Sequence, residues 1–266
     1  FPIREVADIG DEYNIPLIVD NTAAPVICKP IEHGATIVVH SLTKFIGGHG
    51  TTIGGIIVDS GKFDWAKDPK RQPMLNNPDP SYHGMVWTEF AKAVGPIAYI
   101  VRARFVGLRD LGPALPPQSA FQIIQGLETV SLRMEKHCKN AHHVADFLKN
   151  HPKITAVNFA GLEADKSYEL AQRYCDGNPA SLMTFEIEGG FEKAVQFYDA
   201  LKLFKRLVNI GDAKSLACHP ASTTHRQMSE SEQLNAGVTP GMIRLCIGIE
   251  HEEDIIADLS QALDFA

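Results

Sequence analysis

The chain has 266 residues, of which 44% are hydrophobic and 21% charged, and its formal net charge is −7. This length is enough for one large domain or two ordinary ones with a sizeable buried core. Acidic and basic residues are interspersed along the whole length and form no basic stripe. Nucleic acid and anionic membranes are therefore not expected as partners.

The five cysteines are odd in number, widely spaced and without a CxxC pair: Cys28, Cys138, Cys175, Cys218 and Cys246. This pattern predicts free thiols in a reducing compartment, the cytoplasm, rather than disulfides or a zinc site. None of the 11 histidines falls in an HExxH-like spacing, so no metal site is expected. No apolar run approaches the roughly 20 residues of a membrane span, and no signal peptide is present.

The chain opens at Phe1 and runs at once into an amphipathic helix, IREVADIGDEY, over residues 3–13. A helix that leads directly into a core strand is typical of the middle of an α/β fold. We therefore expect a fragment, or one piece of a processed chain.

PLIVD, residues 16–20, is a short apolar segment of the kind found in parallel strands buried on both faces. Asp20 then falls at the carboxyl end of the strand, where open α/β sheets bind their ligands. The alternative is that Asp20 caps a turn or helix, because Asn21 and Thr22 follow it. The residues alone leave both interpretations open.

ATIVVHS, residues 35–41, predicts the next buried strand, and Lys44 follows it closely. A buried ammonium costs several kcal/mol unless it is paired or neutralised. A desolvated lysine is also the residue type that forms Schiff bases. Ser41 and Thr43 flank it with hydroxyl groups suited to a phosphate.

Five glycines are clustered in GGHGTTIGG, residues 47–55. The cluster is neither a Walker loop nor a GxGxxG motif after a strand. It allows the backbone to approach a ligand closely, or it forms a glycine-rich hairpin leading into the strand IGGIIVD. Both interpretations stay open.

Residues 63–117 are rich in loops and include a helix broken around Gly95-Pro96. Pro113, Pro116 and Pro117 mark a domain boundary, which predicts domains 1–117 and 118–266. A long helix is predicted from Ser119 to about Asn150. The strands ITAVNF, LMTFEIE, RLVNIG and MIRLCIG then alternate with helices, as in a small α/β or α+β domain.

VDNT, followed 24 residues after its aspartate by the lysine of HSLTKFIGGHG, resembles the γ-family of pyridoxal-phosphate (PLP) enzymes of cysteine and methionine metabolism. HPASTTH and IRLCIGIEHEEDIIADLSQAL extend the resemblance to the end of the chain. The 266 residues correspond to the last three-fifths or so of a full-length member. FDWAKDP, NIGDAKSLACHPASTTH and EQLNAGVTP are most similar to the O-acetylhomoserine sulfhydrylase subfamily.

The resemblance implies an α/β fold, the PLP-dependent transferase fold type I. Residues 1–117 would be the later part of the large PLP-binding domain, and residues 118–266 the small C-terminal domain. It also implies residue roles. Lys44 would form the Schiff base with PLP and shuttle protons, and Asp20 would pair with the pyridine nitrogen. Ser41 and Thr43 would bind the phosphate, and Thr22 would lie beneath the ring.

For the substrate, the resemblance implies that Arg244 grips the α-carboxylate with two hydrogen bonds and that Asn209 lies near that carboxylate. The alternative for Arg244 is an exposed arginine on an edge strand. Relatives take backbone amides and a stacking aromatic residue from a segment upstream of residue 1. A neighbouring subunit adds a tyrosine and an arginine. We therefore expect a missing N-terminal segment, as a second fragment, to complete the site.

The reaction implied by the resemblance is γ-replacement, in which O-acetyl-L-homoserine and sulfide give L-homocysteine and acetate in methionine biosynthesis. The implied assembly is a homo-oligomer, a dimer of dimers. Methionine γ-lyase, cystathionine γ-synthase and O-succinylhomoserine sulfhydrylase activities of the same family remain open. A non-catalytic structural or regulatory relative is the alternative from a different class.

Overall fold

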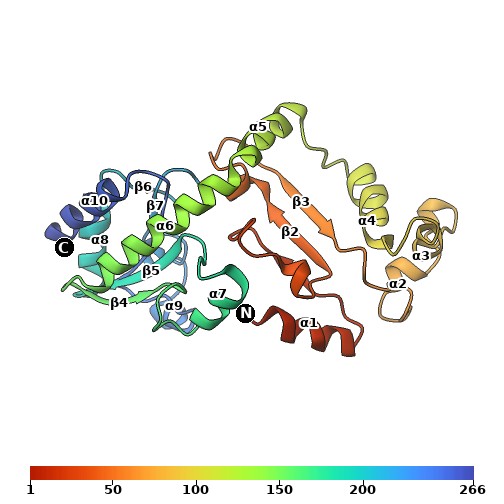
Figure 1. The fold of residues 1–266 in the computed structure, drawn as a ribbon, viewed down its shortest axis with the longest axis horizontal. Helices are drawn as coiled ribbons and strands as arrows, with labels where there is room; N and C mark the ends of the chain where they lie inside the picture. Colours follow the sequence, from red (N-terminus) through yellow and green to blue (C-terminus); the bar gives the residue numbers. More distant parts are fainter. The chain divides into compact units, whose positions relative to one another are not determined.

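The structure is a computed structural model that describes all 266 residues. The chain divides into two compact units, each built from several segments (Figure 1). The first unit contains Phe1–Thr22, Lys29–Ser41 and Ile53–Phe121, and the second contains Ala23–Cys28, Leu42–Thr52 and Gln122–Ala266. The domain boundary expected near Pro117 remains a prediction for the whole protein.

The first unit is organised around a three-stranded sheet in the order β1-β2-β3. Its strands are β1 (Ile18–Asp20), β2 (Ile37–Ser41) and β3 (Gly55–Asp59). β1 is parallel to β2, with Asp20 opposite Val39, and β3 is antiparallel to β2. The helices of this unit are α1 (Ile3–Glu12), α2 (Pro73–Asn76), α3 (Trp87–Ala91) and α4 (Ala98–Arg102), which a π-type segment, Ala103–Asp110, continues.

β1 differs from the strand predicted at PLIVD. It is shorter, and it is not buried on both faces, because Ile18 is 49% exposed and only Val19 lies in a core. β1 also lies at an edge of the sheet, not between two strands. β2 lies in the centre, and its Ile37 is fully buried as predicted.

The second unit contains a five-stranded sheet in the order β4-β5-β8-β7-β6. Its strands are β4 (Ile154–Asn158), β5 (Leu182–Ile187), β6 (Lys205–Arg206), β7 (Leu216–Cys218) and β8 (Met242–Cys246). Neighbouring strands are antiparallel except β6 and β7, which are parallel. The helices are α5 (Pro117–Glu128), whose first residues belong to the first unit, α6 (Val130–Lys149), α7 (Tyr168–Cys175), α8 (Gly190–Ala200), α9 (Glu230–Asn235) and α10 (Glu252–Phe265).

One face of this sheet is covered by α6, α8 and α10 (Figure 1). On β5 every second side chain is buried against these helices, as the period of a strand requires. On the central strand β8, Ile243 and Leu245 are fully buried in the same core. Arg244 between them therefore lies on the opposite face of the sheet.

Two predicted elements of the second unit differ from the structure. The long helix is two helices, α5 and α6, because the backbone at Thr129 is not helical. Of the strand predicted at RLVNIG, residues 206–211, only Arg206 lies in a strand, the two-residue β6. Its remaining residues leave the sheet because Asn209 and Gly211 contact the turn that carries Lys44.

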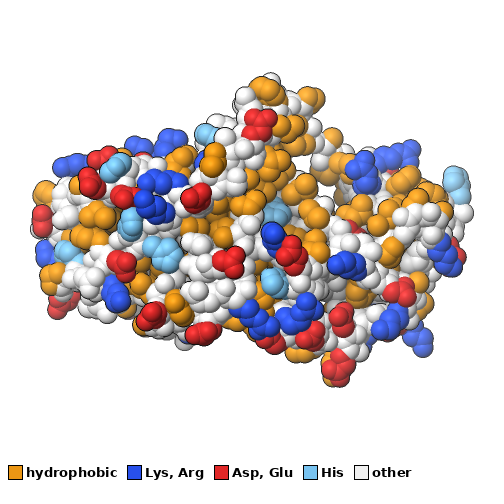
Figure 2. Space-filling view, in the orientation of Figure 1, with side chains coloured by type: hydrophobic (Ala, Val, Ile, Leu, Met, Phe, Trp, Pro, Cys, Tyr) orange, Lys and Arg blue, Asp and Glu red, His pale blue; other side chains and the backbone are white.

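None of the helices is both long and apolar enough to cross a membrane. Figure 2 shows acidic and basic side chains mixed over the visible surface, in keeping with their interspersion along the sequence.

Candidate functional site

In the first unit, Asp20, Thr22 and Ser41 are linked by hydrogen bonds at the ends of β1 and β2. Oδ1 of Asp20 accepts a bond of 3.0 Å from the backbone N–H of Thr22, and the Thr22 side chain also binds this carboxylate. Oγ1 of Thr22 accepts a bond of 2.8 Å from the backbone N–H of Ser41. The side-chain bond from Thr22, followed by its backbone bond, lowers the pKa of Asp20. The turn-capping interpretation of Asp20 thus holds, and the cap keeps the carboxylate ionised.

His40 on β2 is an electrostatic neighbour of Asp20 that no sequence motif singles out. Burial lowers the pKa of His40, and the charge of Asp20 partly offsets this effect. His40 in turn contributes weakly to the lowered pKa of Asp20. The pairing of β1 with β2 creates this proximity, so no sequence motif signals it.

In the second unit, Lys44 lies in a π-type turn, Leu42–Ile46, that follows β2. The turn is closed by hydrogen bonds from Gly47 N to Leu42 O (2.9 Å) and from Gly48 N to Lys44 O (2.7 Å). Nζ of Lys44 donates a hydrogen bond to Oδ1 of Asn209. The side chain of Lys44 is only partly buried, whereas a buried amine was predicted. Lys44, predicted to bind PLP, and Asn209, predicted to lie near the substrate carboxylate, are therefore in direct contact.

Arg133 on α6 anchors this turn. Its guanidinium donates to the carbonyl oxygens of Phe45 (2.6 Å), Ile46 (2.9 Å) and Gly126 (2.7 Å). The side chain is 6% exposed, and burial lowers the pKa of Arg133. Sequence reasoning missed this residue. The sequence did hold one sign of it: Arg133 has the helical spacing of the apolar residues that face the core, such as Val130.

Two glycines permit the close packing around the Lys44 turn. Gly48 has a φ of +74°, and a Cβ there would lie 2.3 Å from the guanidinium of Arg133. Gly211 has a φ of +78°, and a Cβ there would lie 2.3 Å from the backbone nitrogen of Phe45. Gly48, a member of the glycine cluster, therefore serves the packing of the turn itself, within the connection that joins the antiparallel strands β2 and β3.

Arg244 lies on β8, between β5 and β7, so the edge-strand alternative is wrong. Its neighbours in the ladders are Thr184 and Cys218. The side chain is half-buried and forms no ion pair. An unpaired, partly desolvated guanidinium is well suited to bind a carboxylate. Thr43, also partly buried, belongs to the Lys44 turn in the same unit.

The model of the Cys/Met metabolism PLP-dependent enzyme family matches residues 1–264. The chain belongs to this family. It is 52% identical to O-acetyl-L-homoserine sulfhydrylase of Leptospira meyeri, over 98% of this chain and 60% of that protein. It is 49% identical to homocysteine synthase of Schizosaccharomyces pombe, over 99% of this chain and 61% of that protein.

A crystal structure from Campylobacter jejuni, of a protein assigned as an O-acetylhomoserine (thiol)-lyase, superposes with a TM-score of 0.90 at 42% identity. The match covers 98% of this chain and 62% of that one, and that protein carries a pyridoxyl-lysine monophosphate. The predicted family and the predicted fold type I are therefore confirmed. The chain spans about three-fifths of the length of these relatives, and the roles of the individual site residues stay predictions.

Proposed function

We propose that the protein acts as a PLP-dependent transferase that converts O-acetyl-L-homoserine and sulfide to L-homocysteine and acetate. The support is the presence of Lys44 on an anchored turn, in a chain similar over 98% of its length to an O-acetyl-L-homoserine sulfhydrylase. Methionine biosynthesis in the cytoplasm, by a homo-oligomer that is a dimer of dimers, belongs to the same proposal. The five free cysteines favour a reducing compartment.

The side chains fit the chemical groups of PLP. Bound PLP supplies an electrophilic carbon for an amine and a protonated ring that withdraws electrons from the substrate. The lowered pKa of Asp20 keeps its carboxylate charged, so it can hold a proton on the ring nitrogen through a charge-assisted bond. Ser41 and Thr43 offer hydroxyl groups to the phosphate. Thr22, fixed by its bonds to Asp20 and Ser41, presents a stationary surface to the ring.

Lys44 performs the proton transfers in this proposal. Its amine would hold the cofactor through the electrophilic carbon when no substrate is bound. With substrate bound, the same amine would take the proton from the substrate α-carbon and move protons at the β-carbon, while acetate leaves and sulfide adds. The bond from Nζ to Asn209 gives this amine a defined direction.

Arg244 positions the substrate. A guanidinium presents two parallel N–H groups that match the two oxygens of an α-carboxylate. The half-buried position on a central strand limits the movement of the side chain and partly excludes water. These features favour an amino-acid substrate, and they do not distinguish acetyl from succinyl esters.

Product analysis on the whole protein with added PLP tests the proposal. O-acetyl-L-homoserine and sulfide are expected to give homocysteine and acetate in equal amounts, and Lys44→Ala is expected to abolish the reaction. Preference for O-succinyl-L-homoserine, for cysteine as acceptor, or for cleavage of L-methionine would assign one of the related activities instead. No turnover of any of these substrates would favour the non-catalytic alternative.

A further inference from the structure

Asn209 lies in the loop that leads from β6 to β7, residues 207–215. The loop contains no helix or strand, so the position of Asn209 depends on the contacts that hold the loop in place. The backbone N–H of Ala213 donates to the carbonyl oxygen of Gly48 at 2.8 Å. Because Gly48 closes the Lys44 turn, the middle of the loop is docked directly on that turn.

The carboxylate of Glu250 holds the end of the same loop at Ser215. Its Oε1 accepts a bond of 2.7 Å from the backbone N–H of Ser215, and its Oε2 accepts a bond of 2.9 Å from the Ser215 hydroxyl. The hydroxyl oxygen in turn accepts a bond of 2.8 Å from the N–H of Gly248. Ser215 is fully buried, so water does not compete for these bonds.

Glu250 is itself fixed by α6. The fully buried Asn140 donates from Nδ2 to the carbonyl oxygens of Gly248 and Glu250, both at 2.9 Å. The site is also tightly packed, because a Cβ at Gly248 would lie 2.2 Å from the Glu250 carboxylate and 2.4 Å from the nitrogen of Ser215. Glu250 therefore links the end of the loop to a long buried helix.

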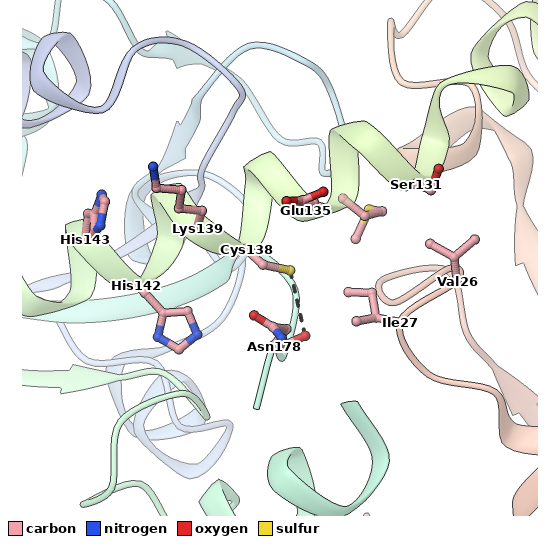
Figure 3. A pocket seen from close by; sticks show the side chains of 10 residues that line it. Val26, Ile27, Ser131, Glu135, Cys138, Lys139, His142, His143 and Asn178 are labelled. Carbon is pink, nitrogen blue, oxygen red and sulfur yellow. Dashed lines mark hydrogen bonds between the residues drawn. The ribbon is translucent and has the colours of Figure 1, made fainter. Parts of the chain in front are cut away.

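Asn140 lies on the face of α6 that also carries Arg133 and His137, since the three residues are spaced four and three apart. The opposite face of α6 lines a pocket of about 550 Å³, to which Glu135 and Cys138 belong (Figure 3). Glu135 is exposed and lies on the pocket face. It is therefore a matched control for a change of glutamate to glutamine.

We propose that Glu250 is a positioning residue for the amino-acid substrate. Its hydrogen bonds are made to Ser215, and through Ser215 it fixes the loop that places Asn209 against Lys44. A fixed Asn209 meets the α-carboxylate of the substrate in one orientation, whereas a loosened loop would first have to be ordered on binding. The inference rests on the proposed function, which supplies this substrate.

Steady-state kinetics of Glu250→Gln in the whole protein with PLP test the role. Glutamine keeps the shape of the side chain but has one acceptor oxygen instead of two. The KM for O-acetyl-L-homoserine is expected to rise about fivefold, the effect of about one net hydrogen bond, with kcat within about twofold of the wild type. The KM for sulfide is expected to stay unchanged, as are all constants of Glu135→Gln.

Hydrogen exchange with mass spectrometry examines the loop without any reaction. The amides of residues 207–215 are expected to exchange about fivefold faster in Glu250→Gln than in the wild type. Glu135→Gln is expected to exchange at the wild-type rate, and β5 is expected to keep its rate in both variants. Equal acceleration of the loop and β5 would indicate general destabilisation and would overturn the positioning role.

A double-mutant cycle tests whether Glu250 acts through Ser215. Ser215→Ala removes the hydroxyl that joins Glu250 to Gly248 and is expected to raise the KM for O-acetyl-L-homoserine in the same way. The double variant is expected to resemble the single variants, because both changes break one link. A multiplied effect, about 25-fold, would show that the two residues act independently and would overturn the proposal. If Ser215→Ala does not fold, the kinetics and exchange of Glu250→Gln still decide.

The kinetic outcomes separate this role from the proposed function. An active wild-type protein whose Glu250→Gln variant keeps its KM, or loses kcat at unchanged KM, overturns the positioning role alone. A wild-type protein that does not turn over O-acetyl-L-homoserine overturns the proposed function, and the role of Glu250 toward this substrate with it.

Discussion

The carboxylate of Asp20 is held by the residue two positions after it, and the same threonine hydroxyl accepts a bond from the start of the Lys44 connection at Ser41. A turn cap and a cofactor-binding carboxylate are usually treated as competing interpretations of an aspartate. Here the cap favours the charged form, which is the form that a pyridinium nitrogen requires.

Thr22→Val is expected to raise the pKa of Asp20, because it removes the side-chain hydrogen bond that contributes most to its lowering. Thr22→Ser, which keeps the hydroxyl, is expected to leave this pKa almost unchanged. Carboxyl ¹³C NMR titration of both variants measures the effect. An unchanged pKa in the valine variant would show that the hydroxyl does not stabilise the carboxylate.

His137 makes the stability of the folded protein depend on pH. It is fully buried, its Nδ1 bonds the carbonyl oxygen of Ile247 at 2.6 Å, and burial lowers its pKa to about 4. An unfolded histidine titrates near 6.5, so protonation favours the unfolded state. The stabilisation is complete above the unfolded pKa of about 6.5 and is lost as the pH falls from there toward the folded pKa of about 4.

The expected loss of unfolding free energy from His137 between pH 7 and pH 5 is about 2 kcal/mol. Urea denaturation at the two pH values measures it. His137→Gln cannot gain the proton, so the difference in stability between the two pH values is expected to shrink by about this amount. Equal pH dependence in both proteins would exclude His137 as the source.

At the scale of elements, the Lys44 turn is held by α6 rather than by the strand that precedes it in the sequence. Arg133 donates to three backbone carbonyls, so its charge is dispersed over peptide dipoles and it needs no carboxylate partner. The rings of Phe45 and His137 also pack edge to face, with centroids 5.2 Å apart.

Arg133→Met is expected to lower the free energy of unfolding by about 3 kcal/mol, because three buried carbonyl groups lose their donor. The free energy of unfolding of Arg133→Lys is expected to lie between that of Arg133→Met and that of the wild type, since an ammonium cannot reproduce the planar donor set. Chemical denaturation measures both. Arg226→Met, at an exposed position, is the matched control and is expected to change little.

The regular elements with strong local patterns could be predicted from the sequence. α10 and β5 are examples, because their apolar residues follow the helical and strand periods closely. β6 could not, because RLVNIG has strand composition but its second half contacts the Lys44 turn. Arg133 could not be assigned either, since two of its three carbonyl partners lie almost ninety residues earlier and backbone groups leave no trace in side-chain patterns.

At the scale of the whole molecule, the family and fold were predictable because the resembling motifs, from VDNT to IRLCIG, extend over nearly all of the chain. Their spacing does not show which contacts each residue makes. The structure adds that Lys44 bonds Asn209 and that Arg244 lies unpaired on a central strand. The relatives are longer, so the proposed reaction is to be tested on the whole protein.

The most direct test of the account is to trap the cofactor on its lysine. The whole protein is incubated with PLP, reduced with borohydride, digested and mapped by mass spectrometry. The account predicts a single pyridoxyl group, on Lys44, and none in Lys44→Arg. A pyridoxyl group on a different lysine, or none on the PLP-treated wild-type protein, would contradict it.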